Sequence, residues 1–351
     1  MRLLLPRHWR VALWIALALL PPCPVAAHGV SLDVHHALAA DSFFQREFLM
    51  PWIAKVEQES GGRIRFHLHP ASTLGATAQA LYEQVRDGGA DLAWTRVVAT
   101  RDNFPRLSLF DYPFLVRHAE GASRAVSEYV RVNDIAERDF DGVRLLAVHV
   151  GDGAQLHWGS AHATPPADVK GRRVVADAPI DGALLVALGA TLVEMPLTQV
   201  ASAMSEGSVD GALLPWARAN GLGIARAAHA HVEFGPDAAG LTSSVFVFAM
   251  NPASYRALAD DLRAVIDANS GIETAAWLGR VLAEDAAAAR KAAAARGDAI
   301  RVATPEERER WQQAARAVTD AATSALEQGG VRIQPLLDSA REQLQTFDAA
   351  K

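Results

Sequence analysis

The chain has 351 residues, of which 50% are hydrophobic and 21% are charged, and its formal net charge is −6. This is the composition of a globular protein with roughly two domains. The acidic balance argues against a nucleic-acid partner, which would favour a basic surface. The single cysteine, Cys23, lies near the N-terminus, so neither a disulfide framework nor thiol chemistry is expected in the rest of the chain.

Residues 1–27 have the pattern of a cleaved signal peptide. Three arginines in the first ten residues precede the uncharged apolar run "VALWIALALL", and "PPCPVAA" then ends in small residues. We therefore expect cleavage after Ala27 and a mature protein in the periplasm. A retained membrane anchor is the weaker interpretation, because ten apolar residues are too short to span about 30 Å of hydrocarbon. Cleavage would change the net charge from −6 to −9.

The next segment predicts strands that alternate with helices. "VSLDVHHALA" opens a strand, and "DSFFQREFLMPWIAKVEQESGG" follows as a helix with Asp41 or Ser42 as its cap. "RIRFHLHP" predicts a second strand, and "TAQALYEQVRDGGADLAWTRV" predicts a helix, a glycine turn and a third strand. Strands and helices in this order indicate parallel βαβ units.

The same alternation continues to the C-terminal third, which is mainly helical. It resumes at "GVRLLAVHV", runs through residues 167–214, and includes the buried strand of "SSVFVFAMNPASYRAL". "IETAAWLGRVLAEDAAAARKAAAARG" then predicts one long helix, because it is rich in strong helix formers and has no proline. The short strand "AIRVA" and a helix from Pro305 complete the chain.

The sequence has no catalytic signature of the common kinds. The phosphate-binding G-x-x-x-x-G-K, the zinc-binding H-E-x-x-H and the nucleophile motif G-x-S-x-G are all missing, so we expect neither an enzyme nor a cofactor. His67 with His69, and His229 with His231, form H-x-H pairs. Two ligands without a third are weak evidence for a metal, and solvated strand faces are the favoured interpretation.

Three blocks of the sequence resemble one known family. They are "SGGRIRFHLHPASTLG", "LFDYPFLVRHAEGA" and "DVKGRRVVADAPIDGALLVALGATLVEMPLTQVASAMSEGSVDG". Their order and spacing between Leu32 and Ile266 are similar to those of the DctP-like substrate-binding proteins of TRAP transporters.

The resemblance implies an α/β fold of two lobes, as in periplasmic binding proteins. The sheets would be parallel or mixed, the ligand cleft would lie between the lobes, and the helix at 272–297 would span both. We expect a first lobe at 28–152 plus about 241–275, and a second lobe at 153–240 plus about 276–351.

The resemblance also implies a function. The protein would be a monomeric periplasmic receptor that closes by hinge bending on a small organic solute and hands it to the permease subunits of the transporter. A sensory protein that presents its solute to a signalling receptor is the alternative, because fold does not fix function.

The arginines that hold a carboxylate in this family are replaced here. The position on the strand after D-l-K-G falls on Val175, and the position of the second arginine falls on Gln155. The glutamate and asparagine that often follow V-D-G are replaced by Leu213 and Leu214. The pattern therefore disfavours a dicarboxylate, and a substitute cation would have to be Arg96, at a strand end, or Arg173, which lies early on its strand.

Three solute classes stay open. An amine could bind Asp152, Asp177 or Asp181 beside Trp158 and Trp216, and an apolar or aromatic solute could stack on the same tryptophans. A monocarboxylate could bind Arg96, because strand C-terminal ends carry the ligands of open α/β sheets. Four further residues follow or end strands and are candidates for the cleft, with the core or the surface as the alternative: Trp94, Arg218, Asn220 and His36.

Overall fold

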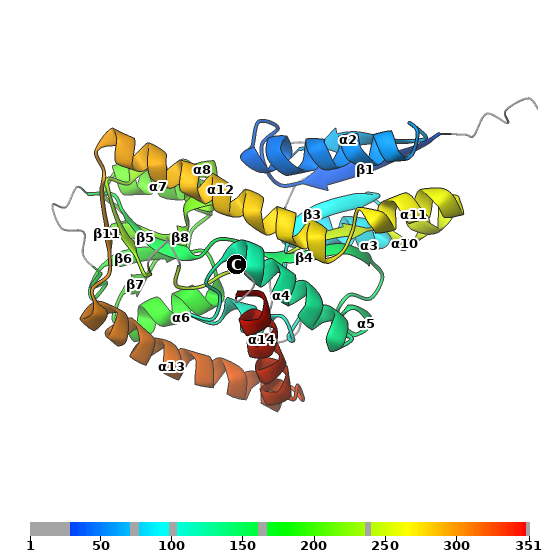
Figure 1. The fold of residues 1–351 in the computed structure, drawn as a ribbon. Coiled ribbons are helices and arrows are strands. Elements are labelled where there is room, and N and C mark those ends of the chain that lie inside the picture. The colour runs from blue at the N-terminus through cyan, green and yellow to red at the C-terminus, as the bar shows by residue number, and fades with distance from the viewer. Residues whose placement is uncertain (1–28, 71–76, 98–103, 161–166, 236–239, 349–351) are drawn as a thin grey trace, which may run out of the picture.

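The protein forms two α/β lobes joined side by side, each built around one sheet (Figure 1). The computed structural model describes residues 29–70, 77–97, 104–160, 167–235 and 240–348, so the expected signal peptide lies outside the described residues. None of the helices in these ranges combines the length and the apolar character that a membrane crossing requires.

The first sheet has five strands in the order β2-β1-β3-β10-β4. Its strands are β1 (Val30–His36), β2 (Ile64–His69), β3 (Leu92–Arg96), β4 (Arg144–Val150) and β10 (Val245–Met250). β1 pairs in parallel with β2 and β3, as the alternation predicts, whereas β10 is antiparallel to both of its neighbours. The sheet is mixed because β10 belongs to the segment that returns from the second lobe.

The second sheet has six strands in the order β11-β9-β5-β8-β6-β7. They are β5 (Ala154–Trp158), β6 (Arg173–Ala176), β7 (Thr191–Leu192), β8 (Gly211–Pro215), β9 (Ala230–Glu233) and β11 (Ala299–Val302). β6 is parallel to β7 and β8, and β5 is antiparallel to β8 and β9. Two lobes with mixed sheets confirm the predicted fold class.

Helices cover both sheets. In the first lobe they are η1 (Gln45–Leu49), α2 (Met50–Glu59), α3 (Ala78–Asp87), η2 (Ser108–Asp111), α4 (Ala119–Val132), α5 (Ile135–Asp139), α10 (Pro252–Ala257) and α11 (Asp260–Ala268). In the second lobe they are α6 (Pro179–Ala187), α7 (Leu197–Ser205), α8 (Trp216–Gly221) and α9 (Ile224–Ala227).

One predicted helix differs in its first turns. The segment after Asp41 forms the π-helix η1 before α2 begins, with Pro51 at the start of α2. Proline has no N–H to donate to the carbonyl four residues earlier, which favours a widened turn at this point. The backbone N–H of Gln45 donates to Ser42 Oγ (3.3 Å), so Ser42 is the polar group at the start of this segment.

The long helix predicted from the C-terminal composition is confirmed as α12 (Ile272–Arg296, 25 residues). It packs on α4 and β4 of the first lobe and on α8 and α9 of the second, so it spans both (Figure 1). Half of its buried residues are alanines, and Gly279 is also buried, which allows close helix packing. α12 is therefore a continuous helix that packs on both lobes.

The last two helices pack on different lobes. α13 (Pro305–Gln328) begins with a capping box of Thr304 and Glu307 and packs on α6 of the second lobe. α14 (Ile333–Asp348) packs on α4 of the first lobe. We propose lobe boundaries near 152/153 and 240/241, where the chain passes between the sheets, and we place α14 with the first lobe rather than the second.

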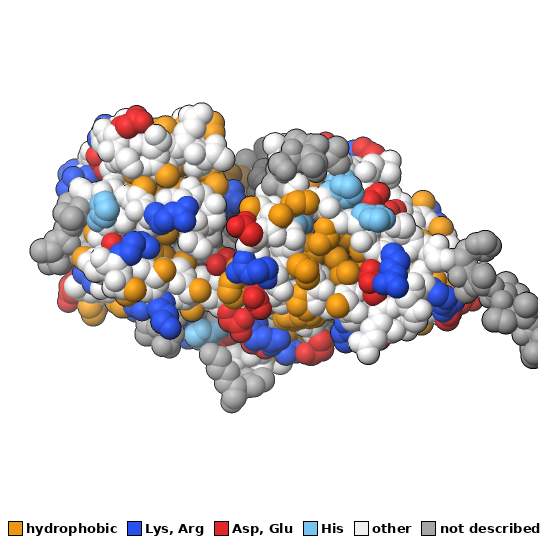
Figure 2. Space-filling view, turned by 90° about the horizontal axis from the view of Figure 1, so that it is seen from above, with side chains coloured by type: hydrophobic (Ala, Val, Ile, Leu, Met, Phe, Trp, Pro, Cys, Tyr) orange, Lys and Arg blue, Asp and Glu red, His pale blue; other side chains and the backbone are white. Residues whose placement is uncertain are grey.

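Charged side chains gather where the lobes meet. In the view from above, acidic and basic groups lie next to one another along the middle of the molecule, while hydrophobic side chains gather over the first lobe (Figure 2).

Candidate solute-binding site

Arg96 and Asp177 form an ion pair between the two lobes. Arg96 ends β3 in the first sheet, and Asp177 directly follows β6 in the second. Arg96 Nη1 lies 3.1 Å from Asp177 Oδ2 and also donates to the Asp177 backbone oxygen at 3.2 Å. The carboxyl ends of strands are where open α/β sheets bind ligands. The structure thus brings together two residues that the sequence predicted separately.

A second guanidinium group, from Arg218 on α8, binds the same carboxylate. Arg218 Nε lies 2.8 Å from Asp177 Oδ1, and the Asp177 side chain is only 3% exposed. Two guanidinium groups on one carboxylate leave one positive charge in excess. Because a guanidinium has five N–H donors, both arginines keep donors that Asp177 does not use. Arg96 Nε is buried and finds no acceptor among the described residues.

Two further acids lie beside this cluster but carry little charge near pH 6. Burial raises the pKa of Asp111 to about 8, although the Arg96 guanidinium opposes the shift. Burial likewise raises the pKa of Asp181 to about 7, and Thr242 Oγ1 donates to Asp181 Oδ1 (2.5 Å). In slightly acidic solution the positive excess of the arginines is therefore retained.

An aromatic column lies on the same face of the first sheet as Arg96. Trp94 and Arg96 are two residues apart on β3 and so share a face. Phe246 on β10 pairs with Arg96 in the sheet register. The Trp94 ring stacks on Phe246 (centroids 4.9 Å apart) and on Phe44 (4.1 Å). Trp94 and Phe44 are buried, so Phe246 is the partly exposed ring of this column, and it lies next to Arg96 in the sheet.

His36 shares this face, but it is a buried residue. It pairs with Trp94 in the register and is 1% exposed. Its Nδ1 accepts from the Leu38 backbone N–H (3.2 Å), so its Nε2 donates to Gln45 Oε1 (2.9 Å). Burial lowers the pKa of His36. The structure therefore gives it a neutral, packed imidazole rather than a solvated one.

The predicted residues on β5, β6 and β8 lie inside the second lobe. Trp158 and Leu213 are buried in the core on the face of the sheet opposite to Val175. Val175 is 2% exposed and belongs to the apolar cluster under α7, α8 and α12. Gln155 is buried and accepts from the Phe234 backbone N–H at 3.2 Å. None of these side chains joins the Arg96 cluster in the described structure.

Two predicted residues on α8 have partners of their own. The Trp216 indole donates to Glu233 Oε1 (3.1 Å), and Trp216 is buried. Asn220 is exposed and its side chain hydrogen-bonds Asp285, whose pKa burial raises to about 6. These residues attach α8 to β9 and to α12 rather than to Asp177.

Arg173, the other substitute that the sequence offered, lies away from the Arg96 cluster. Its guanidinium pairs with Asp210 on the surface, with Nη2 2.6 Å from Oδ1 and Nε 3.3 Å from Oδ2. The pair lowers the pKa of Asp210 and fixes the turn before β8. Of the two substitute cations that the sequence offered, only Arg96 reaches the junction of the lobes.

The interpretation of the H-x-H pairs as solvated strand faces is wrong for His231. It is fully buried on β9, with Nδ1 2.8 Å from His157 Nδ1. Burial lowers the pKa of His231 to about 3 and that of His157 well below its usual value. The reason is that α8 and α12 cover this face of the second sheet. The described residues contain no cluster that could hold a metal ion.

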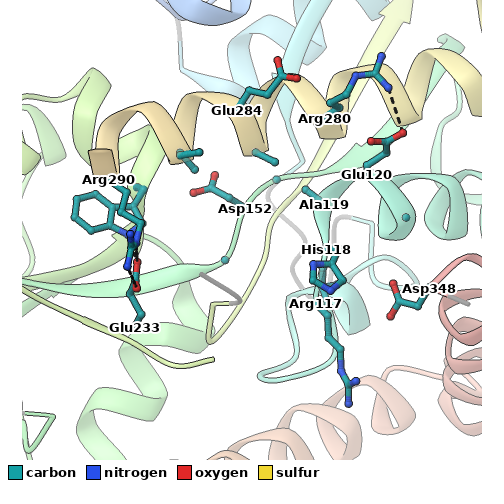
Figure 3. Close-up of a pocket in the computed structure, with 18 of the residues that line it drawn as sticks. Arg117, His118, Ala119, Glu120, Asp152, Glu233, Arg280, Glu284, Arg290 and Asp348 are labelled. Carbon is teal, nitrogen blue, oxygen red and sulfur yellow. Dashed lines mark hydrogen bonds and ion pairs between the residues drawn. The ribbon is translucent and has the colours of Figure 1, made fainter. Parts of the chain in front are cut away.

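A separate groove of about 1020 Å³ lies under α12, between the first connection of the lobes and the start of α4 (Figure 3). Two ion pairs line it: Arg290 Nε lies 2.6 Å from Glu233 Oε1, and Arg280 Nη1 lies 3.2 Å from Glu120 Oε1. Asp152, a candidate for an amine, accepts from the Ala217 backbone N–H (3.4 Å), and burial raises its pKa to about 7. The groove is lined by other residues than Arg96 and Asp177.

Three residues around the cluster were not predicted. Asp111 stands in the "LFDYPFL" block, and a lone acid in an apolar segment is a signal that could have found it. Thr242 and Phe246 lie in the segment that returns from the second lobe, and only the antiparallel placement of β10 brings them to Arg96 and Asp181. No sequence pattern marks that placement.

Comparison with known proteins places the chain in a family. The model of the bacterial extracellular solute-binding proteins, family 7 (DctP), matches residues 35–325. A TRAP solute-binding protein from Rhodoferax ferrireducens, solved with copurified benzoate, is 36% identical, with 91% of this chain and 99% of that chain covered and a TM-score of 0.83.

Two other proteins are similar to this chain. A marine metagenome TRAP solute-binding protein specific for aromatic acid ligands, solved with 3-hydroxybenzoate, is 30% identical, covers 92% of this chain and 99% of its own, and has a TM-score of 0.84. The outer membrane transporter protein TsaT of Comamonas testosteroni is 25% identical over 72% of this chain and 75% of its own length. These relatives give no support to the sensory alternative. The chain belongs to the family 7 bacterial extracellular solute-binding proteins, which serve TRAP transporters.

Proposed function

We propose that the protein is the periplasmic receptor of a TRAP-type transporter and that its solute is an aromatic monocarboxylate, which it delivers to the membrane permease. The observation that carries this proposal is the Arg96–Asp177–Arg218 cluster, which has one positive charge in excess and unused N–H donors. A guanidinium offers a planar pair of donors that matches the two oxygens of a carboxylate.

The surroundings of Arg96 favour an aromatic acid over an aliphatic one. Phe246 lies opposite Arg96 in the sheet and stacks on Trp94, so an aromatic face borders the guanidinium. Relatives at 36% and 30% identity were solved with benzoate and with 3-hydroxybenzoate. The aromatic face beside Arg96 and the ligands of these relatives thus support the same class of solute.

An amine is the less suitable solute. Asp177, one of the three acids predicted to bind an amine, is already neutralised by two guanidinium groups. A third cation there would meet an excess of positive charge, which costs free energy in a partly buried site. The cluster also favours a receptor over an enzyme, because its arginines and Asp177 bind charge and include no nucleophile held by a base.

The proposal is tested by comparing matched ligands in a thermal-shift assay and by calorimetry. We expect benzoate and 3-hydroxybenzoate to raise the melting temperature by mass action, whereas benzamide and benzylamine leave it unchanged. Arg96→Ala should weaken benzoate binding at least tenfold, because it removes charge-assisted hydrogen bonds worth about 1.5–3 kcal/mol.

The control variant is Arg65→Ala. Arg65 also pairs with a glutamate, Glu57, but it is 62% exposed on β2, away from the junction of the lobes. Its replacement should leave benzoate binding at the wild-type level. A melting temperature that responds to benzylamine and to none of the acids would contradict the proposed solute class.

A further inference from the structure

We propose that Asp177 determines which charge of solute the cleft accepts: it is a resident counter-anion that neutralises one of the two arginines, so that the cleft binds acids with one negative charge and rejects those with two. This inference rests on the proposed function, because it takes the Arg96 cluster as the binding site for a carboxylate.

Asp177 is enclosed between the two arginines. Its carboxylate lies between Arg96 Nη1 (3.1 Å) and Arg218 Nε (2.8 Å), and its side chain is 3% exposed. A carboxylate so enclosed keeps its two bonds at little cost in side-chain freedom. The two arginines therefore present one net positive charge to any solute rather than two.

The donors left over match a single carboxylate. Asp177 uses one Nη of Arg96 and the Nε of Arg218. Arg96 Nε remains buried without an acceptor among the described residues, and burying such a donor unpaired costs free energy until a ligand accepts from it. One carboxylate group of a solute satisfies that donor and balances the excess charge. A second would be left without a cation.

The neighbouring acids do not change the balance in slightly acidic solution. Burial raises the pKa of Asp111 to about 8 and that of Asp181 to about 7, so both are mainly protonated at pH 6. Thr242 supplies a hydrogen bond to Asp181 without adding charge. At pH 6 the charges of these two acids are therefore small in wild type, whereas loss of the Asp177 charge removes one of the causes that raise their pKa values.

The test changes the net charge of the cluster one step at a time. The net charge of the cluster formed by Arg96, Arg218 and residue 177 is +1 in wild type, +2 in Asp177→Asn, zero in Arg218→Gln and +1 again in the double variant. The Arg96 guanidinium also donates to the backbone oxygen of residue 177. This hydrogen bond does not depend on the side chain at position 177, so we expect it in all four proteins. Thermal unfolding without solute establishes that each variant is folded.

Benzoate affinity, measured by calorimetry at pH 6, should follow this charge. Arg218→Gln is expected to weaken binding at least tenfold, and the addition of Asp177→Asn should restore it to within about threefold of wild type, since charges this close interact by several kcal/mol. A double variant that binds no better than Arg218→Gln would overturn the inference. So would an Arg218→Gln variant with wild-type affinity.

A second pair of ligands tests the rejection of dianions. Isophthalate and 3-carbamoylbenzoate have nearly the same shape, but the amide of the second replaces one carboxylate. The ratio of their affinities should shift at least tenfold towards isophthalate in Asp177→Asn, and an unchanged ratio would overturn the inference. Where neither compound fits the cleft, the benzoate series decides.

The matched control is Asp210→Asn, which removes the carboxylate from the ion pair of Asp210 with Arg173 on the surface of the second lobe. It should bind benzoate as wild type does. If wild-type protein binds none of these acids, the proposed function itself fails. If wild type binds benzoate but the variants do not follow the charge, only the role of Asp177 fails.

Discussion

At the scale of single residues, His149 shows how burial makes an imidazole resist protonation. His149 is fully buried on β4; Trp94 Nε1 donates to its Nε2 (2.8 Å), and its Nδ1 faces the Val150 oxygen (3.3 Å). The imidazole is therefore neutral, and burial lowers the pKa of His149 to about 3. A proton on Nε2 would break the bond to Trp94, beside the proposed site.

The sign of the effect follows from linkage. The pKa of His149 is lower in the folded protein than in the unfolded chain, where it is near 6.5. The unfolded chain takes up a proton first, so folding stability is lost as pH falls below about 6.5. The raised pKa values of Asp111, Asp152 and Asp181 act in the opposite direction, because these acids take up protons first in the folded state.

A single substitution isolates the histidine. Glutamine at position 149 can still accept from Trp94 but does not titrate. As pH falls from about 6 to 4, we expect the free energy of unfolding of His149→Gln to increase relative to that of wild type by about 1.4 kcal/mol per pH unit. Urea unfolding at several pH values measures this difference. The same replacement at exposed His67 controls for the loss of an imidazole, and parallel profiles for wild type and His149→Gln would contradict the argument.

At the scale of elements, α12 depends on one close contact with α4. A Cβ atom on Gly279 would lie 2.3 Å from Ser123 Oγ and 2.5 Å from the Ala119 oxygen. Because one of these atoms belongs to the backbone of α4, the helices would have to separate. We expect Gly279→Ala to lower the free energy of unfolding by about 1–3 kcal/mol, the usual cost of overpacking.

The control for this prediction is Gly221→Ala at the end of α8. A Cβ atom there would meet nothing within 4 Å. Alanine is the better helix former, so this variant should match or slightly exceed the stability of wild type. Denaturant unfolding of both variants is the measurement. Equal stabilities would show that α12 and α4 can adjust to the added methyl group.

The elements also show what the sequence can predict. α12 was predicted at 272–297 and occupies Ile272–Arg296, because composition alone favours a helix there and Gly297, with a φ of +88°, ends it. The π-helix η1 was not predicted, since nothing in an apolar helical pattern distinguishes it from an ordinary turn. β10 was predicted as a strand, but its antiparallel pairing depends on the path of the chain between the lobes.

At the scale of the whole molecule, the candidate site depends on how the lobes face each other. Arg96 and Asp177 are 81 residues apart, and each could be placed at a strand end from local pattern alone. Which guanidinium meets which carboxylate depends on the angle between two sheets. The elements that join the lobes are α12, the connections near 152/153 and 240/241, and the turn between α13 and α14, which lie far apart in sequence. Sequence patterns therefore supplied Arg96 and Asp177 as separate candidates but not their contact.

The two connections touch at a pair of glycines, and this contact gives the last prediction. The Ala154 backbone N–H donates to the Thr242 oxygen (2.8 Å), and the Leu241 N–H donates to the Ala154 oxygen (2.9 Å). A Cβ atom on Gly153 would lie 2.3 Å from Gly240 Cα. Backbone cannot move aside as a flexible side chain can, so Gly153→Ala should force the connections apart.

Gly153 and Gly240 lie outside the strands of both sheets, so we expect Gly153→Ala to fold. The added methyl group would destabilise the relative position of the lobes, in which Arg96 contacts Asp177, by about 1–3 kcal/mol. Benzoate affinity should then fall by roughly five- to a hundredfold, and small-angle scattering should show less compaction on addition of benzoate than in wild type. The control is Gly89→Ala, whose added Cβ atom would approach no atom closer than 3.5 Å. Wild-type affinity and compaction in Gly153→Ala would mean that the connections do not control how the lobes close on the solute.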